Sequence, residues 1–489
     1  MNTRRNPQGL LGQMMLQSTI KIKITAVLVS TALALTVLWP VQTAALTIKE
    51  EKELSKEFLK VIASRYQLIT DPCIVDYVNR IGHKILAHMP PQPFTYQFYV
   101  IDDNVYNAFA SPAGHIFVNR GLLAALDNES ELAGILAHEI AHVVCRHLSQ
   151  RIERSKKINL ATLAGMVAGV FIGMGGAAAA GNAVAMGSVA AGQSLTLAYS
   201  RDNEIQADQL GLNYLKNAGY SAKGLLTSLQ KIRSQQWFGS DQVPTYLMTH
   251  PAAEDRLAYI GSWIEQHEKA TDKPDVDDRF LRIHTRIMAL FGEPDLALQQ
   301  YSTLVKEHPK DVYARYGYAL VLSRVNLHQQ SIEQMKKVLE LRALDPFFHQ
   351  EMGSIYFLAG RYEEALSVLD KAISNSQDDV MGRYYLGRTH LSLNQLEAAA
   401  ADLQGVIESA PEYDQAYYFL GETFGRMNRM GDAHYYLGIY YERKHNLKNA
   451  LFHLNQALRS THDPQRHEEI KRRLAGLGKE ERDVQKQNP

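Results

Sequence analysis

The spacing of apolar and polar residues divides the chain into two regions of different character. In the first, apolar positions at helical spacing predict a buried helix at 132–144, and the alternating, aromatic-rich stretch 94–101 predicts a β-strand. Residues 107–118 predict a turn followed by a second strand. The polar stretch 265–278 indicates a linker or the start of a new domain, and a regular repeat begins beyond it.

The second region repeats at a fixed interval. Glycines recur once per period at Gly353, Gly387 and Gly421, and small side chains recur at the same interval at Ala297, Ser331, Ala365, Ala399 and Ala433. The interval is about 34 residues, the length of one tetratricopeptide repeat. Small residues are typical of the points where the two helices of such a repeat cross, and Pro309 and Pro411, three periods apart, mark the ends of second helices. The pattern predicts an all-α repeat solenoid over residues 271–489.

The last repeat departs from this period. Gly438 and Ala450 keep the offset that separates Gly421 from Ala433, but they follow that pair after only half a period. We therefore expect an extra or unpaired helix near the C-terminal end.

The buried helix of the first region carries an HExxH pattern that begins at His138 and ends at His142. Residues four apart lie on one face of a helix, so both histidines can offer imidazole nitrogens to one metal ion. Glu139 lies beside the pair, where its carboxylate can take a proton from a metal-bound water and return it to a leaving amine. The spacing predicts a zinc site that cleaves peptide bonds.

A catalytic zinc needs a third protein ligand, and the stretch 200–211 offers carboxylates for this purpose. Glu204 and Asp208 are again four residues apart on one helix face. This spacing fits Glu204 as the third ligand and Asp208 as the acceptor of an N–H from a ligand histidine. A solvated acidic helix face is the alternative, and the upstream HExxH pattern favours the metal site.

These two helices, followed by Thr249-His250-Pro251 and Arg256, resemble the HtpX-like and CAAX-protease-like branch of the gluzincin metallopeptidases. The resemblance is strongest to members that carry tetratricopeptide repeats, and it covers nearly the whole chain. It implies a mostly α protein: an α+β zinc metallopeptidase domain with a small sheet, followed by the repeat solenoid. The expected boundaries are 1–45 for a signal peptide, 46–270 for the peptidase domain and 271–489 for the repeats.

The resemblance also assigns roles. It implies that His138, His142 and Glu204 bind one zinc ion per chain, and that Glu139 is the general base and acid. It places His250 on a mobile loop that can approach the metal. There, a neutral imidazole can fill the open coordination position and inhibit the enzyme. Once displaced, it can instead help to stabilise the oxyanion of the tetrahedral intermediate. A histidine that only caps a turn is the third alternative.

The role of one further residue is ambiguous, and two histidines are not expected to take part in metal binding or catalysis. Arg256 is either a structural or oxyanion-side cation near the site or a solvated surface arginine. His115 precedes a strand at no recognised metal spacing, so we do not expect it to bind metal. His147 follows His142 by five positions, turns off the ligand face, and is expected to be an ordinary histidine at a helix end.

The N-terminal residues 1–45 have the pattern of a signal peptide. Basic residues precede the apolar run 24–39, and small residues follow at 43–45. Cleavage near Ala45 would release a protein that begins at about Leu46. An uncleaved membrane anchor is the alternative, because the apolar run is nearly long enough to span a bilayer. In both cases the catalytic region lies outside the cytoplasm.

A second apolar region, 160–198, lies between the two metal-binding helices. No charged residue occurs from Ala161 through Ser200, and glycines are frequent. Glycine weakens a soluble helix but allows close backbone packing. We expect a mobile helical hairpin over the active-site cleft that contacts a membrane or an unfolded client, with a transmembrane hairpin as the alternative.

Composition limits the partners. With 489 residues, 46% hydrophobic and 21% charged, the chain is globular and long enough for more than one core. A formal net charge of zero gives no electrostatic case for nucleic acid. Cys73 and Cys145 could pair in an oxidising compartment, although we expect Cys145 to pack as a small apolar residue.

Taken with the resemblance, these features predict a periplasmic zinc endopeptidase that degrades misfolded or stalled proteins. The resemblance implies outer-membrane β-barrel proteins as clients, and it adds help with their assembly. The repeats are expected to bind the β-barrel assembly machinery, and the enzyme is expected to associate peripherally with a membrane. The alternative is a chaperone or scaffold of outer-membrane protein assembly whose proteolysis is normally autoinhibited.

Overall fold

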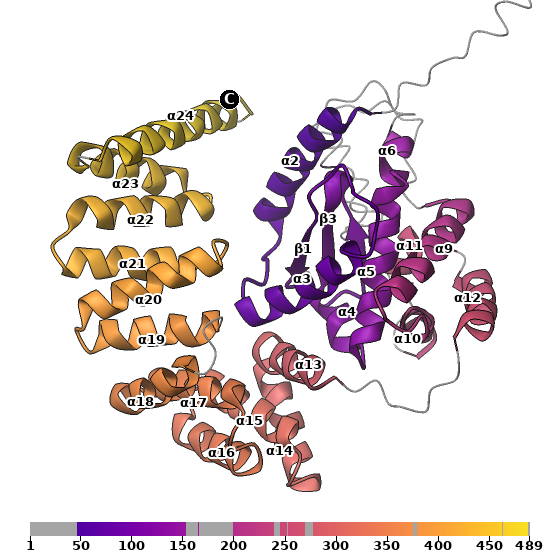
Figure 1. Ribbon diagram of the computed structural model, residues 1–489, viewed down its shortest axis with the longest axis horizontal. Helices are drawn as coiled ribbons and strands as arrows, with labels where there is room; N and C mark the ends of the chain where they lie inside the picture. Colours follow the sequence, from indigo (N-terminus) through magenta and orange to yellow (C-terminus); the bar gives the residue numbers. More distant parts are fainter. Residues whose placement is uncertain are drawn as a thin grey trace, which may run out of the picture. The chain divides into compact units, whose positions relative to one another are not determined.

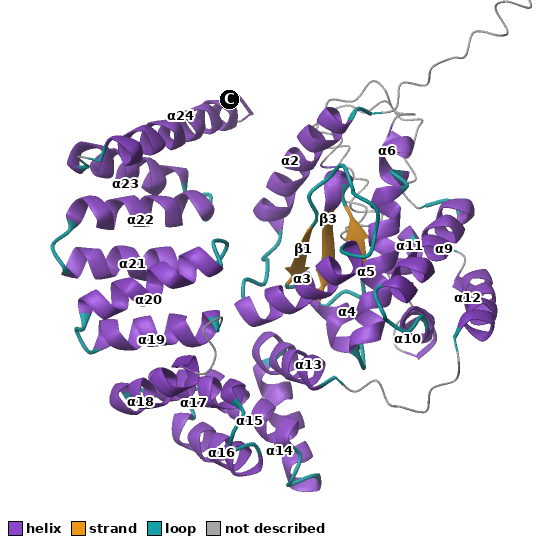
Figure 2. Cartoon of the chain, viewed as in Figure 1, coloured by secondary structure: helices purple, strands orange, loops and turns teal. Residues whose placement is uncertain are grey.

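The computed structural model describes residues 46–152, 165, 199–238, 245–251, 253–268, 277–374, 379–461 and 463–487. Helices dominate this part of the chain, with one small sheet among them (Figures 1 and 2), which confirms the predicted fold class. The expected signal peptide and, apart from Gly165, the apolar hairpin lie outside the described residues. None of the described helices is both long and apolar enough to cross a membrane.

The sheet that the structure describes has strands β1 (Gln97–Ile101), β2 (Ala108–Ala110) and β3 (His115–Asn119). Its order is β1-β3-β2, with β1 parallel and β2 antiparallel to the central β3. The single strand expected after residue 107 is therefore two strands. A short 3-10 turn at Pro112–Gly114 separates them, and left-handed backbone at Ala113 and Gly114 (φ 64° and 93°) reverses the chain there.

The first region of the chain has nine described helices. They are α2 (Ile48–Arg65), α3 (Pro72–Leu86), α4 (Arg120–Ala125), α5 (Glu129–Val144), α6 (His147–Ile152), α9 (Arg201–Asn217), α10 (Lys223–Phe238), α11 (Thr245–Thr249) and α12 (Ala253–His267). The HExxH helix α5 is central: it packs against α9, α10 and β2, and it is buried from Glu129 through Val143. A helix that is apolar on all sides is expected at such a position.

The start of α5 is fixed by polar contacts. The Asn128 side chain caps the helix by accepting the Glu131 N–H at 2.9 Å. The Glu129 carboxylate lies in the first turn, where the helix dipole favours a negative charge. It accepts hydrogen bonds from the hydroxyls of Tyr77 and Tyr220, both at 2.9 Å. These contacts fix where the metal-binding helix begins.

Two glycines let α10 approach α5 closely. A Cβ on Gly224 would lie 2.0 Å from the Ser130 carbonyl oxygen, and one on Gly134 would lie 2.6 Å from the Leu225 nitrogen. Backbone atoms cannot move aside as a flexible side chain can. The crossing of the two helices therefore requires glycine at both positions.

The repeat region contains twelve helices in its described part. The helices are α13 (Asp278–Phe291), α14 (Pro294–Glu307), α15 (Val312–Arg324), α16 (His328–Leu341), α17 (Pro346–Leu358), α18 (Tyr362–Ser374), α19 (Val380–Ser392), α20 (Leu396–Ser409), α21 (Asp414–Arg426), α22 (Met430–Arg443), α23 (Leu447–Ser460) and α24 (Pro464–Gln487). The helices α15, α17, α19 and α21 begin at Val312, Pro346, Val380 and Asp414, so their starts are each one period apart. The predicted period is confirmed.

The helix pairing departs from the repeat at the end, as expected. Helices α23 and α24 begin at Leu447 and Pro464, one period after the starts of α21 and α22 to within one position. However, α22 packs closely on both α21 and α23, whereas α24 packs less extensively on α23. A Cβ on Gly438 in α22 would lie 2.7 Å from the Leu454 side chain in α23, just as one on Gly421 in α21 would lie 2.8 Å from the Leu437 side chain in α22. The α22–α23 crossing therefore repeats the crossing found within a repeat, and α24 is the extra helix.

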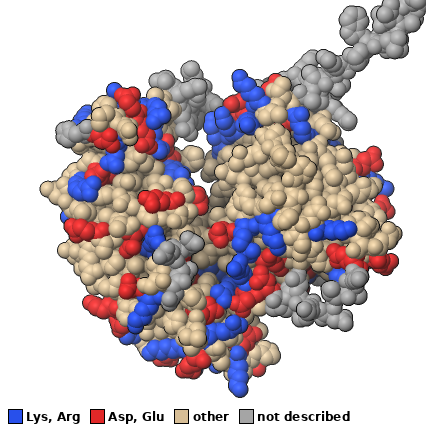
Figure 3. Space-filling view, viewed as in Figure 1, with Lys and Arg blue, Asp and Glu red and all other residues tan. Residues whose placement is uncertain are grey.

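Helix α13 belongs to two cores. Phe280, Ile283 and Ile287 pack in the core of the peptidase region, whereas Ala289 packs with the repeats. The buried Arg286 forms ion pairs at 2.8 Å with Asp71, the N-cap of α3, and with Glu351 in α17. Both described cysteines are free. On the surface, charges of both signs are interspersed (Figure 3), in line with the zero net charge.

The α5–α10 crossing makes a stability prediction. Gly224→Ala is expected to destabilise the protein by about 1–3 kcal/mol or more, because the new methyl group overlaps backbone atoms of α5. Gly261→Ala in α12 is the matched control, since no atom lies within 4 Å of its Cβ position. Chemical denaturation measures both variants. Equal stability of Gly224→Ala and the wild type would contradict the account.

Candidate metal centre

Three elements bring four side chains that could hold a metal ion to one buried point. Helix α5 contributes His138 and His142, α9 contributes Glu204, and the residue after α11 is His250. One ligand atom from each lies within 4.8 Å of all the others. All four side chains are almost completely buried, at 0–2% exposure. The structure therefore joins the sequence-predicted ligand set to His250.

The spacing of the donor atoms fits a single ion. His138 Nε2 lies 3.0 Å from His142 Nε2 and 3.3 Å from His250 Nδ1. Glu204 Oε1 lies 3.4 Å from His142 Nε2 and 3.2 Å from His250 Nδ1. Donors held about 2.1 Å from one ion at tetrahedral corners are roughly 3.4 Å apart. The four donors thus have the separations of a tetrahedral site.

Glu139 faces this cluster without joining it. Its side chain is 0% exposed, and within the described chain neither of its oxygens has a hydrogen-bond partner. The His250 ring faces it, with Nε2 3.6 Å from Glu139 Oε1. Burial raises the pKa of Glu139, with His250 and His138 acting in the opposite direction. A buried carboxylate with no partner and a raised pKa suits proton transfer at the centre.

Asp208 supports His138 from behind. Asp208 Oδ1 lies 2.8 Å from His138 Nδ1, so the Nδ1–H can be donated to the carboxylate while Nε2 faces the cluster. Arg256 donates from Nε and Nη2 to the two Asp208 oxygens at 2.7 and 2.8 Å, and its Nη1 lies 2.6 Å from Glu204 Oε2. Tyr259 also donates to Asp208. Asp208 is thus placed to orient the His138 ring.

The exposure of these side chains excludes two alternatives that the sequence left open, an acidic surface face and a surface arginine. Glu204 and Asp208 are 0% exposed, so they do not form a solvated acidic face. Arg256 is also 0% exposed and is not a surface arginine. A bidentate guanidinium–carboxylate pair of this kind is both strong and geometrically specific. Arg256 is therefore the structural cation of the site.

The charge environment prepares most of the donors for a cation. Burial alone would raise the pKa of Glu204, but Arg256 and His250 hold it well below its usual value. Burial lowers the pKa of His142 well below its usual value, which leaves the imidazole neutral. For His138, burial and Arg256 act downward, but Asp208 and Glu204 raise the pKa to about 9. A metal ion at Nε2 would therefore compete with a proton on His138.

His250 is held in place by its neighbours. Its ring stacks on the Tyr246 ring with 4.3 Å between centroids. The backbone N–H of His250 donates to the backbone carbonyl of Tyr246 at 2.8 Å. Tyr199 stacks on His142 at 3.9 Å, and the Tyr199 N–H donates to the Thr249 carbonyl at 2.9 Å. Two aromatic rings thus cover the histidines of the cluster.

Sequence reasoning missed Tyr199, Tyr246 and His147. The two tyrosines have no motif, and only the packing of distant segments brings them to the site. His147 was expected to lie off the ligand face, yet its Nδ1 is 3.0 Å from His142 Nδ1. His115 lies in β3 beside the Tyr99 hydroxyl and is not one of the clustered donors.

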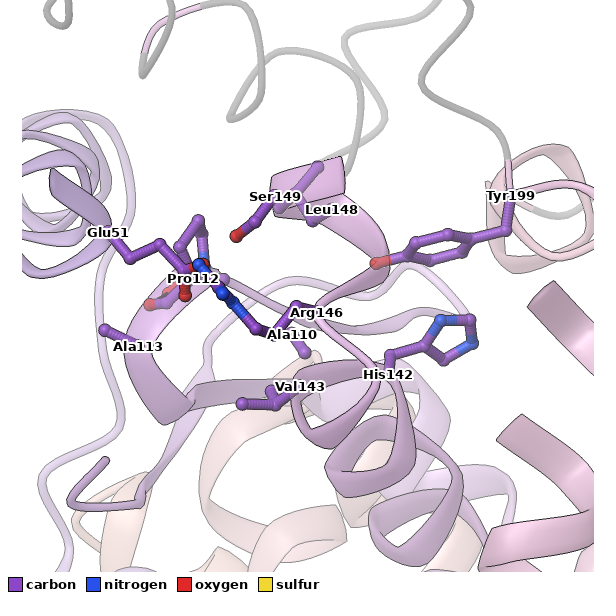
Figure 4. A pocket seen from close by; sticks show the side chains of 11 residues that line it. Glu51, Ala110, Pro112, Ala113, His142, Val143, Arg146, Leu148, Ser149 and Tyr199 are labelled. Atoms are coloured by element: carbon purple, nitrogen blue, oxygen red, sulfur yellow. Dashed lines mark hydrogen bonds and ion pairs between the residues drawn. The ribbon is translucent and has the colours of Figure 1, made fainter. Parts of the chain in front are cut away.

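A small pocket opens beside His142 (Figure 4). Apolar residues such as Ala110 and Val143 line it together with the charged Glu51 and Arg146, and His142 and Tyr199 lie at one side. Ala110 is the last residue of β2, so an outer strand of the sheet ends next to the metal centre.

Comparison with known proteins agrees with this geometry. Residues 75–264 match the family described as Peptidase family M48, and residues 291–347 and 356–418 match tetratricopeptide repeats. The beta-barrel assembly-enhancing protease of Yersinia pestis is 28% identical over 369 residues, which is 73% of each chain. The protein of the same name from Escherichia coli is 24% identical over 415 residues, 78% of this chain and 85% of its own.

Among solved structures, MamA from Desulfovibrio magneticus aligns with 35% of this chain and 95% of its own, at 20% identity and a TM-score of 0.29. The sequence matches and the site together establish the enzyme class: the chain carries an M48 metallopeptidase domain followed by tetratricopeptide repeats.

The buried cation of the site makes a second prediction. Arg256→Met leaves Glu204 and Asp208 buried without their guanidinium, so we expect a loss of about 3–5 kcal/mol in the metal-free protein. Arg120→Met, which breaks the more exposed pair with Asp102, is the matched control and should cost less. Denaturation in the presence of a chelator measures both. Equal losses in the free energy of unfolding would show that the buried ion pairs of Arg256 stabilise the protein no more than the exposed pair of Arg120.

Proposed function

We propose that this M48 metallopeptidase is a zinc-dependent endopeptidase of the periplasm that degrades misassembled outer-membrane β-barrel proteins and assists the assembly of others. The observation that carries the proposal is the buried set of His138, His142, Glu204 and His250 beside the unpartnered Glu139. The names of the relatives support a role in β-barrel assembly. The expected signal peptide at 1–45 supports the periplasm.

Zinc is the ion that this donor set fits best. Three imidazoles and one carboxylate at tetrahedral spacing are typical zinc ligands, whereas calcium and magnesium prefer oxygen donors in larger number. Charge supports a divalent cation as well. With neutral histidines, three buried carboxylates (Glu139, Glu204, Asp208) and one guanidinium (Arg256) sum to −3 + 1 = −2. A divalent ion cancels this charge.

In this proposal the side chains divide the work. When bound, the zinc ion acidifies a water molecule and polarises the peptide carbonyl. Glu139 takes the proton of the nucleophilic water and passes it to the leaving amine, a role that its raised pKa suits. Asp208 and Arg256 keep the ring of His138 in position. Burial of all these groups excludes bulk water from the proton transfer.

His250 holds the site closed in the described conformation. Its Nδ1 occupies a fourth donor position, which a catalytic zinc site leaves for water or substrate. Its Nε2 points to Glu139, so the same ring also lies in front of the general base. We therefore assign His250 as an inhibitory ligand that a client must displace. The repeats supply the surface for clients and assembly partners.

Glu139→Gln tests the enzyme. The amide keeps the shape of the side chain but cannot accept the proton, so client turnover should fall by at least about 100-fold. Zinc content and melting temperature should stay close to those of the wild type, which shows that the site is still built. Turnover of an unfolded outer-membrane protein by the purified full chain is the measurement.

The same variant separates the enzyme from a chaperone or scaffold. If client turnover in Glu139→Gln is unaltered and outer-membrane protein assembly in cells continues, the peptidase proposal fails. If turnover is lost while assembly is retained, assembly help does not require cleavage.

His250→Ala tests the closed state. Removal of the fourth donor should raise proteolysis of an unfolded client about tenfold or more, because the open form no longer competes with the closed one. His267→Ala, at an exposed histidine of α12, is the control and should leave turnover unchanged. Lower activity with zinc retained would instead make His250 a catalytic group, and no change would reduce it to a turn residue.

A further inference from the structure

Each HExxH histidine has a partner at its second ring nitrogen, but the two partners differ. His138 Nδ1 faces the Asp208 carboxylate at 2.8 Å. His142 Nδ1 faces His147 Nδ1 at 3.0 Å, and His147 Nε2 lies 3.0 Å from the Gln206 side-chain oxygen. His147 is only 2% exposed, and its ring meets that of His142 edge-on at 5.0 Å between centroids.

If His142 binds a metal through Nε2, the hydrogen atoms in this row of hydrogen bonds can be placed in only one way. A neutral His142 that offers its Nε2 lone pair to a metal carries its proton on Nδ1. That N–H must be donated to His147 Nδ1, which therefore has no proton of its own. The proton of His147 then lies on Nε2 and is donated to the Gln206 oxygen, which can only accept. Every polar atom in the row has a matched partner.

A break in the helix brings His147 to this position. Extension of α5 would turn a residue five positions after His142 by about 140° away from it. Instead, α5 ends at Val144, and Arg146 adopts left-handed backbone with φ 54° before α6 begins at His147. A non-glycine residue in this region is strained and needs support. Arg146 receives it from an ion pair with Glu51 of α2.

We propose that His147 is a positioning residue of the metal centre, which fixes the tautomer and ring orientation of His142 and is itself fixed by Gln206. The inference rests on the proposed function, in which His142 binds zinc. The carboxylate of Asp208 makes His138 the more basic ligand, whereas the neutral His147 only orients His142. Because Gln206 lies two positions after Glu204 on α9, the row also ties two ligand-bearing helices together.

The test measures zinc affinity and coordination of the full chain. Competition with a chromophoric chelator gives the dissociation constant for zinc, and the visible spectrum of the cobalt-substituted protein reports the coordination geometry. His147→Asn places an amide oxygen near the position of Nδ1 and keeps an acceptor. His147→Leu keeps the bulk without an acceptor. His115→Leu makes the same exchange in β3, away from the metal centre.

His147→Leu should weaken zinc binding about 10- to 100-fold and shift the cobalt spectrum, whereas His147→Asn should stay within about threefold of the wild type. His115→Leu should leave both readouts unchanged. Equal effects of Asn and Leu at position 147 would reduce His147 to packing, and wild-type affinity of His147→Leu would overturn the proposal outright.

A second variant covers a failure of His147→Leu to fold. Gln206 is exposed, so Gln206→Leu should fold, and loss of the acceptor should weaken zinc binding several-fold, toward the lower end of a roughly tenfold effect. An unchanged affinity of Gln206→Leu overturns the row of hydrogen bonds. A wild-type chain that binds no zinc overturns the proposed function instead, so the two failures can be told apart.

Discussion

The metal centre depends on one constraint, which is that carboxylates are buried where water cannot solvate them. Glu139, Glu204 and Asp208 are all 0% exposed, and Arg256 is the cation packed against the last two. A buried charge costs several kcal/mol unless another charge and good hydrogen bonds compensate it. The pairing of Arg256 compensates part of this cost, and in the proposed enzyme a divalent ion compensates the rest. That proposal therefore links metal loading to the folding of this region.

The sequence predicted the parts of the site that follow local helix geometry. The i, i+4 pairs of α5 and α9 place their side chains correctly because helical spacing is set within a single element. Contacts between elements do not follow from spacing. Arg256 hydrogen-bonds to Asp208 from a different helix. The Tyr246 ring stacks on the His250 ring, and no sequence motif predicts this contact. The prediction that His147 turns away from His142 assumed that α5 continues, and it failed because the left-handed backbone at Arg146 changes the chain direction. The turn at Pro112–Gly114 split an expected strand for the same reason.

In the proposed function, the fourth donor makes the resting state a balance between a closed and an open arrangement. His250 is favoured at the centre by the Tyr246 stack and by backbone bonds from both sides of its loop. A client that opens the site gains a coordination position but must displace these contacts. A shift from 99:1 closed to 99:1 open requires about 5.5 kcal/mol of preferential binding to the open form. Contacts made only at the cleavage site rarely supply this alone, so binding elsewhere on the client, such as to the repeats, lowers the requirement.

The repeats are attached to the metal-binding helix through buried polar contacts and not only through a linker. Glu351 in α17 and Asp71 at the start of α3 share Arg286 of α13. Helix α3 in turn holds the first residue of α5, because the Tyr77 hydroxyl donates to Glu129. A buried guanidinium between two carboxylates resists separation, since removal of any partner leaves a charge uncompensated. The start of the HExxH helix is therefore positioned by the same framework that carries the first repeats.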